Sequence, residues 1–484
     1  MKHRLFNPRN AFSVVLLASL LFAVPVVAED TVSNSAPTNV LFLAIDDLRP
    51  ELGAYGASYM HTPSIDSLAA TGVTFVRAYS NVPVCGASRA SMLTGLRPTR
   101  ERFLTYYTRM DEDAAGTPTI PGWFKQAGYT TISLGKIAHH GDDSQESWSE
   151  EPWTPQNQSL PGYKKWRNYL VEENIREDMK KDGRPPAFEA PDVDDDAYFD
   201  GRVAVRAIEL LQRFKEQQEP FFLAVGFVKP HLPFNAPEKY WDLYPEGSVQ
   251  GVVSQAFPEK APQQAWHSWG ELRHYKDVPG GEAPVPEALA QQLVRGYRAA
   301  TSYSDAQVGR VLDELDRLGL AQNTIVVLWG DHGWSLGEHG LWAKHSPFEL
   351  ANRIPLIVRA PGVSTGEAQS LVESVDIFPT LVELAGLPAP DHLEGSSFMA
   401  TLKNPAVNHK DAVFTRWQNS DSIRTDRYHY TEWRNPKDEV IARMLYDHVT
   451  DPDERQNVAE NPDYAIILAE LSQALAAHLA TLQM

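Results

Sequence analysis

Residues 39–45 read Asn-Val-Leu-Phe-Leu-Ala-Ile and run directly into Asp46 and Asp47. An unbroken apolar run of this kind is typical of a strand that is buried on both faces, as in the centre of a parallel sheet. Similar runs occur farther along the chain. They predict strands over residues 130–134, 220–227, 324–329 and 355–358.

Helical patterns lie between these predicted strands. Their periodicity predicts helices over residues 64–70, 88–94, 120–127, 197–216 and 288–318, the last of them broken once. Strands that alternate with helices indicate an α/β fold, in which a large, mostly parallel central sheet is sandwiched by helices. Ligands of such sheets bind beyond the carboxyl ends of the strands. Polar residues that follow predicted strands should therefore meet there: Asp46, Lys136, Lys229, His231, Asp331 and His332.

The sequence changes character towards its end. Short alternating runs, followed by an Ala/Leu-rich amphipathic stretch over residues 464–482, predict a smaller antiparallel sheet with a terminal helix. We therefore expect a main domain over residues 37–404 and a smaller C-terminal subdomain over residues 405–484. Two stretches without periodicity, residues 140–196 and 235–283, are predicted to be long loops over the ligand site.

The composition excludes several classes of protein. The chain has 484 residues, 44 Lys and Arg against 63 Asp and Glu, a formal net charge of −19 and one cysteine. Its length and its 43% hydrophobic content exclude a disordered protein and a small disulfide scaffold. The acidic balance argues against nucleic acid as a partner, because such a partner requires a basic surface. One cysteine can form neither an internal disulfide nor a thiolate zinc site.

The N-terminus is typical of a secretory signal peptide over residues 1–28. Lys2, Arg4 and Arg9 precede an apolar run, and Val26 and Ala28 fit the small residues at a cleavage site. A retained membrane anchor is the alternative. Cleavage would remove three basic and no acidic residues, which changes the net charge from −19 to −22. We expect an exported protein, periplasmic in a bacterium or secreted, without a membrane span after signal removal.

The single cysteine opens the string Cys-Gly-Ala-Ser-Arg-Ala-Ser-Met-Leu-Thr-Gly, residues 85–95. By position alone, Cys85 fits either a buried structural residue or an activated group at a helix N-terminus. The string resembles the signature of type I sulfatases, a formylglycine-dependent family of the alkaline-phosphatase-like superfamily. The resemblance implies that a formylglycine-generating or sulfatase-maturing enzyme oxidises Cys85 to formylglycine (3-oxoalanine). One hydroxyl of the hydrated aldehyde would then attack sulfur, and the other would later expel sulfate.

Acidic residues after two predicted strands suggest a metal site. Asp46 and Asp47 by themselves fit a turn as well, but Asp331 and His332 follow another strand in the same topological place. Three carboxylates and an imidazole suit Ca²⁺ or Mg²⁺ better than zinc. The resemblance implies one Ca²⁺ held by these four residues and an oxygen of converted Cys85. Many relatives have Asn at the position of His332, which leaves its role as a direct ligand open.

The resemblance also assigns three cations to the site, each of which also fits a solvated or structural role. Lys136 and Lys344 would bind the sulfate group, and Arg89 would hold the hydrated aldehyde. Fixed positive charges of this kind stabilise the charge that a sulfate group gains as its ester bond breaks.

Proton transfer in the family is assigned to histidines and one aspartate. The resemblance implies that His139 is the base that lets sulfate leave, although adjacent His140 offers the same chemistry. His231 would protonate the departing alcohol, and Asp331 would deprotonate the attacking hydroxyl.

The likeness covers nearly the whole mature chain, so residues 37–404 would be the catalytic sulfatase domain. The strings at residues 39–56, 128–141, 220–234 and 331–346 resemble the iduronate-2-sulfatase branch. The implied activity is hydrolysis of sulfate esters in a sulfated polysaccharide or its oligosaccharides, for example at O2 of a uronate. Two alternatives stay open: a phosphonate monoester or phosphodiester hydrolase of the same superfold, and a non-catalytic binder of sulfated glycans.

Overall fold

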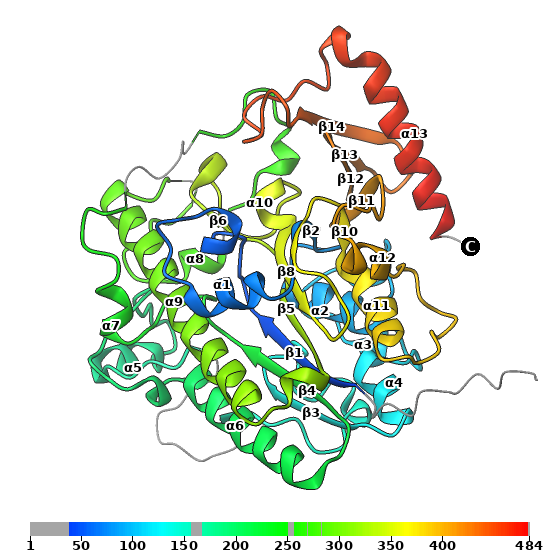
Figure 1. Ribbon diagram of the computed structural model, residues 1–484. Coiled ribbons are helices and arrows are strands. Elements are labelled where there is room, and N and C mark those ends of the chain that lie inside the picture. Colours follow the sequence, from blue (N-terminus) through cyan, green and yellow to red (C-terminus); the bar gives the residue numbers. More distant parts are fainter. Residues whose placement is uncertain (1–37, 156–166, 250–255, 269, 282, 483–484) are drawn as a thin grey trace, which may run out of the picture. The chain divides into compact units, whose positions relative to one another are not determined.

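The computed structural model of the protein describes residues 38–155, 167–249, 256–268, 270–281 and 283–482 (Figure 1). The predicted signal peptide, residues 1–28, lies outside these residues.

The centre of the fold is a mixed, mostly parallel sheet, as predicted. Within the described residues it has eight strands in the order β10-β2-β8-β5-β1-β4-β3, and β9 pairs with β2. The strands are β1 (Asn39–Ile45), β2 (Val73–Tyr79), β3 (Thr130–Gly135), β4 (Phe221–Phe227), β5 (Thr324–Gly330), β8 (Arg353–Arg359), β9 (Gly366–Ala368) and β10 (Val372–Glu373). Strands β3, β4, β1 and β5 are parallel, whereas β8 is antiparallel to both of its neighbours. The apolar runs of the sequence did not predict β2 or the short strands β9 and β10.

Helices cover both faces of this sheet, and the apolar side chains of β1 pack against them on each face. Val40, Phe42 and Ala44 pack with one group of helices, and Leu41 and Leu43 pack with another. The first group is α2 (Cys85–Thr94), α4 (Ile120–Gln126) and α11 (Ile377–Leu384), and the second is α1 (Pro63–Ala70), α6 (Phe199–Gln217) and α9 (Glu287–Arg317). The continuous apolar runs of the sequence are thus explained by burial on both sides.

One predicted helix differs from expectation. Helix α9 runs for 31 residues without a break, so the predicted interruption is wrong. The helix continues through Gly296, where there is no room for a side chain. A Cβ atom there would lie 2.8 Å from Trp241 and 3.1 Å from Phe234. Small residues in this helix allow close packing with neighbouring aromatic rings.

The two stretches predicted as loops contain only short helices among their described residues. The α-helices among them are α5 (Glu172–Asp178), α7 (Glu238–Trp241) and α8 (Gly270–Arg273), and the others are single turns of 3-10 helix. Other short α-helices and strands are α3 (Met110–Asp113), β6 (Ser335–Leu336), β7 (Trp342–Ala343), α10 (Glu349–Asn352) and α12 (Met399–Lys403).

The C-terminal part forms the predicted antiparallel sheet with a terminal helix. Its strands are β11 (Ala412–Trp417), β12 (Ser420–Thr425), β13 (Tyr428–Arg434) and β14 (Val440–Asp447), in that order, with α13 (Ala465–Thr481) packed on them (Figure 1). Leu471 and Leu475 of α13 are buried against Tyr430 and Leu445. Within the described residues, Pro462–Thr481 is also the one helical stretch long and apolar enough to cross a membrane. The domain boundary expected at residue 404 stays a prediction.

Candidate active site

The parallel strands end at one edge of the sheet and place the polar residues there. Ile45 at the end of β1 pairs with Phe227 of β4 and with Gly330 of β5, and Gly135 of β3 pairs with Gly226. Backbone hydrogen bonds continue past these ends: the Asp46 amide donates to Phe227 O over 3.1 Å, and the Lys136 amide to Gly226 O over 3.0 Å. The convergence expected from the sequence is therefore a direct result of strand register.

Three carboxylates are buried at this edge. Asp46, Asp47 and Asp331 have no measurable exposure, and the amide of Asp47 donates to Asp331 Oδ1 over 3.0 Å. Asp47 has a φ of 59°, in the left-handed region, and turns the chain sharply after β1. Backbone conformations of this kind are costly for a residue with a side chain, and they concentrate at functional sites.

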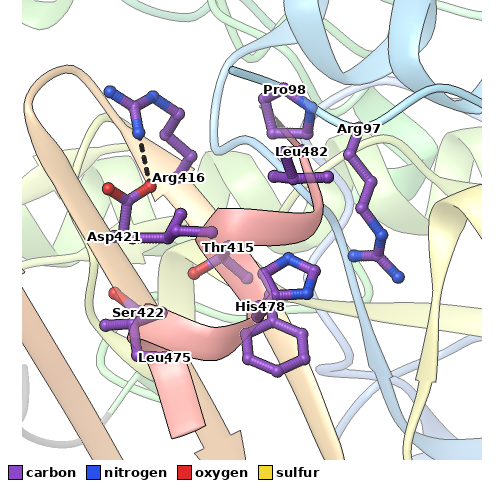
Figure 2. A pocket seen from close by; sticks show the side chains of 11 residues that line it. Arg97, Pro98, Thr415, Arg416, Asp421, Ser422, Leu475, His478 and Leu482 are labelled. Carbon is purple, nitrogen blue, oxygen red and sulfur yellow. Dashed lines mark hydrogen bonds and ion pairs between the residues drawn. The ribbon is translucent and has the colours of Figure 1, made fainter. Parts of the chain in front are cut away.

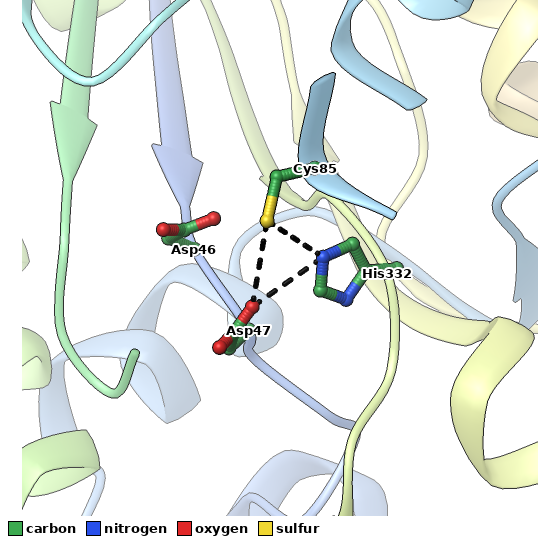
Figure 3. Close-up of side chains that lie close together, drawn as sticks. All are labelled: Asp46, Asp47, Cys85 and His332. Atoms are coloured by element: carbon green, nitrogen blue, oxygen red, sulfur yellow. Dashed lines mark hydrogen bonds and ion pairs between the residues drawn. The ribbon is translucent and has the colours of Figure 1, made fainter. Parts of the chain in front are cut away.

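Cys85 lies beside these carboxylates as the first residue of α2. Its Sγ is 3.2 Å from His332 Nε2 and 3.8 Å from Asp47 Oδ1 (Figure 3). Ligand atoms of Asp46, Asp47, Cys85 and His332 all lie within 4.8 Å of one another. Burial, with the charge of Asp46, raises the pKa of Cys85 to about 12, so the unmodified thiol is neutral at pH 7.

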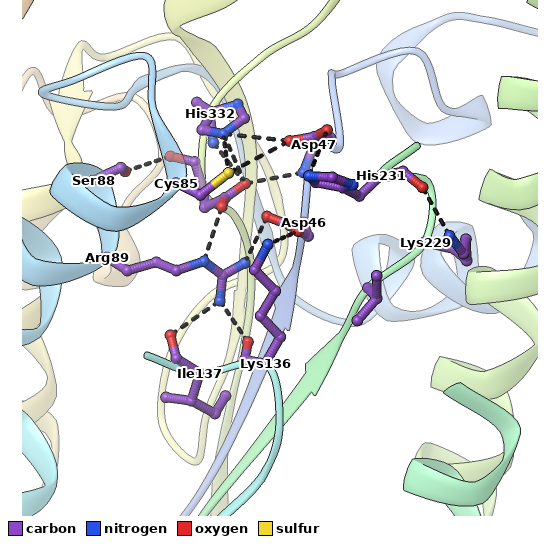
Figure 4. A network of polar contacts seen from close by, with 12 residues as sticks. Asp46, Asp47, Cys85, Ser88, Arg89, Lys136, Ile137, Lys229, His231 and His332 are labelled. Carbon is purple, nitrogen blue, oxygen red and sulfur yellow. Dashed lines mark hydrogen bonds and ion pairs between the residues drawn. The ribbon is translucent and has the colours of Figure 1, made fainter. Parts of the chain in front are cut away.

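Arg89 and Lys136 neutralise part of this negative charge. Arg89 Nε donates to Asp331 Oδ2 over 2.9 Å and Nη2 to Asp46 Oδ1 over 3.2 Å, while Nη1 donates to Ile137 O over 3.0 Å (Figure 4). Lys136 Nζ contacts Asp46 Oδ2. Burial opposes ionisation of Asp46, but these two cations outweigh it and hold the pKa of Asp46 well below its ordinary value.

Lys344 is the third cation, and a strained loop holds it in place. Its Nζ donates to Asp47 Oδ1 over 2.8 Å and lies 5.0 Å from the ring centroid of Trp334. The flanking residues Ala343 and His345 have φ values of 69° and 73°. The pKa of Asp47 is nevertheless raised well above its ordinary value, because burial outweighs the attraction of Lys344.

The donor set suits a hard divalent cation. Carboxylate oxygens dominate it, and calcium and magnesium prefer oxygen ligands. The raised pKa of Asp47 indicates that the charges present do not fully compensate this buried carboxylate. A cation held by Asp46, Asp47, Asp331 and His332 would supply that compensation. These residues therefore fit the metal that the sequence predicted.

His231 lies on the loop that follows β4. Its Nδ1 is 2.7 Å from Leu232 O, so this nitrogen carries the proton and donates. Its Nε2 faces Glu271 Oε1 at 3.1 Å and Asp47 Oδ2 at 3.8 Å. Buried Lys229 holds the loop, since its Nζ donates to His231 O over 2.9 Å. The loop thus presents Nε2 to the site.

Glu271 is a site residue that the sequence analysis missed. It lies on α8, within the long stretch predicted as a loop, and its Oε2 is 3.3 Å from Lys344 Nζ. It therefore contacts both His231 and Lys344. Residues 256–283 have no periodicity that would indicate such a contact, so nothing in the sequence marked this glutamate.

His139 and His140 follow β3 and Lys136. Within the described residues, His139 Nδ1 and His140 Nε2 are buried without a hydrogen-bond partner. Burial, helped by the charge of Lys136, lowers the pKa of His139 to about 2, so its imidazole is neutral. The neutral ring has an unprotonated nitrogen, but burial and Lys136 both oppose its protonation. The geometry does not distinguish His139 from His140 as the base that the sequence predicted.

A second His/Glu cluster lies in the C-terminal part. Ligand atoms of Glu349, His429, His448 and Glu454 lie within 4.8 Å of one another. Arg424 Nη2 donates to His448 Nδ1 over 3.0 Å, which leaves the proton of this ring on Nε2, facing Glu454 Oε1 at 3.1 Å. Basic and acidic side chains of this cluster therefore hydrogen-bond to one another, with Arg424 and the two histidines facing Glu349 and Glu454.

A small cavity under α13 is not a ligand site (Figure 2). Its volume is about 10 Å³, the space of one water molecule at most. Arg416 and Asp421 at its wall form an ion pair of 2.5 Å, and His478 stacks on Phe414 with ring centroids 3.6 Å apart. None of these residues belongs to the strand edge described above.

Comparisons with known proteins agree with this geometry. A family model described as "Sulfatase" matches residues 38–387, and one described as "N-sulphoglucosamine sulphohydrolase, C-terminal" matches residues 337–481. The chain is 32% identical to iduronate 2-sulfatase of Mus musculus, over 94% of this chain and 97% of that protein. It is 35% identical to iduronate 2-sulfatase of Homo sapiens, over 83% and 79%. A solved structure of a phosphonate monoester hydrolase from Agrobacterium radiobacter shares the fold, with a TM-score of 0.70, 24% identity and coverage of 92% and 96%.

Proposed function

Because the chain belongs to the sulfatase family and is a sulfuric ester hydrolase, we propose that it removes sulfate from a sulfated polysaccharide or its oligosaccharides. The preferred ester would be at O2 of a uronate such as iduronate. Two relatives named iduronate 2-sulfatase, each more than 30% identical, support this choice of substrate.

One observation carries the proposal: Cys85 lies buried among three carboxylates and three cations at the edge of the sheet. Arg89 contacts both Asp46 and Asp331, Lys136 contacts Asp46, and Lys344 contacts Asp47. Together they supply fixed positive charge in a largely buried site, where such charge stabilises a transition state more strongly than it would in water. A sulfate group that gains charge on its leaving oxygen requires that environment.

Conversion of Cys85 to formylglycine by a maturation enzyme is part of the proposal. After conversion, the hydrated aldehyde at residue 85 would supply one hydroxyl for attack on sulfur and a second one whose deprotonation would let sulfate leave. Two observations support the conversion. Cys85 is the only cysteine of the chain, and its raised pKa makes the unmodified thiol a weak nucleophile.

Calcium is also part of the proposal, with Asp46, Asp47, Asp331 and His332 as its ligands. When bound, the ion polarises the sulfate oxygens and the attacking hydroxyl. His332 Nδ1 lies 2.9 Å from Gly333 O and therefore carries the ring proton in the neutral form. Its unprotonated Nε2 faces Cys85 and Asp47, as a ligand nitrogen must.

Proton transfer to the departing alcohol is assigned to Nε2 of His231. Burial and the charge of Lys344 hold the pKa of His231 well below its ordinary value, because they outweigh the opposing carboxylates of Glu271 and Asp46. A histidine that donates from Nε2 while Nδ1 bonds to Leu232 O is doubly protonated. Glu271 at 3.1 Å favours that form.

The proposal includes export through the segment over residues 1–28 and a mature protein without a membrane span. The apolar character of residues 1–28 supports the first part. The packing of Leu471 and Leu475 of α13 against the C-terminal sheet supports the second.

A comparison of substrates tests the proposed function. Protein co-produced with a maturation enzyme would be assayed on an aryl sulfate, an aryl phosphonate monoester, an aryl phosphodiester and 2-O-sulfated uronate disaccharides. We expect the sulfate esters to be turned over fastest, and the 2-O-sulfated uronates better than 6-O- or N-sulfated isomers. Preference for the phosphonate or the phosphodiester would favour the alternative hydrolase. Binding of sulfated glycans without any turnover would favour the non-catalytic binder.

A further inference from the structure

Two neighbouring tyrosines are unusually exposed for their size. The side chains of Tyr106 and Tyr107 are 45% and 68% exposed, on the segment between α2 and α3. Their ring centroids are 4.1 Å apart, their planes differ by 38°, and their hydroxyls lie 2.7 Å from one another. Each ring therefore supports the other, and both leave aromatic surface in contact with water.

The pair borders the site described above. A side chain at Gly86, the residue after Cys85, would meet the carbonyl oxygen of Tyr106 at 2.6 Å, so this backbone packs directly on the start of α2. The ring of Tyr106 lies 6.2 Å from that of His139, centroid to centroid. The exposed rings are thus continuous with the wall of the site on the side of His139.

We propose that Tyr106 and Tyr107 form a sugar-binding platform for the ring that adjoins the sulfated one. The proposal rests on the proposed function, because it takes the ligand to be a saccharide. A pyranose ring has an apolar face of C–H groups, and stacking that face on an aromatic ring removes apolar surface from water. The tyrosine hydroxyls at the edge of the platform would meet the sugar hydroxyls.

The size of the platform favours a sugar over a protein partner. A stable protein interface buries more than about 1,000 Å² in total, which two side chains do not provide. The platform also adjoins the site through His139 and Gly86, so a saccharide with one ring in the site can reach it with the next. A glycan chain with its sulfated ring in the site would pass over it.

The test compares substrates of different length in single variants. In Tyr106→Ala and Tyr107→Ala, we expect KM for a 2-O-sulfated trisaccharide to rise about 2- to 10-fold with little change in kcat, the range of one lost aromatic contact. KM for an aryl sulfate, which does not reach the platform, should stay unchanged. Tyr107→Phe, which keeps the ring, should retain most of the wild-type KM. Tyr59→Ala is the matched control, because Tyr59 is 52% exposed but Arg298 covers its ring at 4.3 Å.

A binding measurement separates failure of this inference from failure of the proposed function. Calorimetry with a desulfated uronic-acid trisaccharide requires no turnover, and we expect its Kd to rise in the alanine variants by the same factor. Equal binding by wild type and both alanine variants would overturn the platform even if the enzyme hydrolyses sulfate esters. Self-association that is lost in the alanine variants, without any effect on the saccharide, would overturn it in favour of a contact between copies of the chain.

Discussion

The Nε2 atom of His332 lies 3.2 Å from the Sγ atom of Cys85, although 247 positions separate the two residues in the chain. His332 follows β5 and Cys85 begins α2, so the contact joins a strand end to a helix start. In the neutral ring that carries its proton on Nδ1 and donates it to Gly333 O, the nitrogen that faces sulfur has a free lone pair. His332 is therefore suited to bind a metal beside residue 85.

Substitution of His332 tests this role. We expect His332→Ala to weaken calcium binding about 10- to 100-fold, whereas His332→Asn, which keeps a donor atom, loses less. The rise of Tm with calcium concentration measures affinity without reference to activity, since a ligand of the native state stabilises it. An identical calcium dependence of Tm in wild type and His332→Ala would show that His332 is not a ligand.

His231 should matter most for substrates with a poor leaving group. In His231→Ala we expect kcat/KM for a sugar sulfate to fall by about 10²- to 10⁴-fold, the usual contribution of a general acid. An aryl sulfate should lose much less, because its phenolate leaves without a proton. His339→Ala serves as control, since His339 is buried but bonds to Asp453 O at 2.7 Å, outside the site. Equal losses on both substrates would count against the role of His231.

Glu271 should set the pH range over which His231 can act as a general acid. Burial and Lys344 lower the pKa of His231, and Glu271 raises it. Glu271→Gln removes the raising charge, so His231 holds its proton only at lower pH. We expect the alkaline limb of kcat/KM for a sugar sulfate to move down by about one pH unit. Glu460→Gln, at an exposed glutamate before α13, should leave the profile in place. A shift to higher pH in Glu271→Gln would contradict the assignment.

Glu373 should stabilise the fold away from the site. This buried carboxylate accepts hydrogen bonds of 2.6 Å from Arg97 Nη1 and Nη2 and from Lys410 Nζ. Burial opposes its ionisation, but both cations outweigh burial and hold its pKa below the ordinary value. Glu373→Gln should lower the free energy of unfolding at pH 7 by about 3–5 kcal/mol in urea titrations.

The pH dependence of stability provides the check on Glu373. Because the folded-state pKa is lowered, the stabilisation is complete above the unfolded-state pKa of about 4.5 and is lost as the pH falls through the folded-state value. The difference between wild type and Glu373→Gln should therefore shrink in acid. Glu394→Gln, at a partly exposed pair with Arg102, should cost no more than about 1 kcal/mol. A difference that does not change with pH would show that lost packing, not charge, destabilises the variant.

The part of the fold that carries the site is predictable because its burial is nearly complete. Strands β1 and β5 have every residue buried, so their apolar runs stand out in the sequence and their ends mark Asp46 and Asp331. Strand β2 cannot be predicted in this way, because Thr74 and Arg77 interrupt its apolar run. The antiparallel direction of β8 is not encoded in its composition, since an apolar strand has the same pattern in either direction.

The part of the site that comes from loops is not predictable in the same way. Glu271 lies 40 residues after His231, in a stretch without periodicity, and their contact depends on how α8 packs. The exposed position of Tyr106 and Tyr107 also depends on packing, here of a backbone segment against Gly86. Sequence patterns report burial along an element, but they do not report which distant loops meet.

Sulfate-ester hydrolysis by this protein should depend on conversion of Cys85. Mass spectrometry of the peptide that contains residue 85 tests it most directly, on protein made with and without a formylglycine-generating enzyme. We predict the mass of the aldehyde or its hydrate at residue 85 in active protein, with aryl sulfatase activity in proportion to the converted fraction. Full activity in protein whose residue 85 is entirely an unmodified thiol would contradict the account.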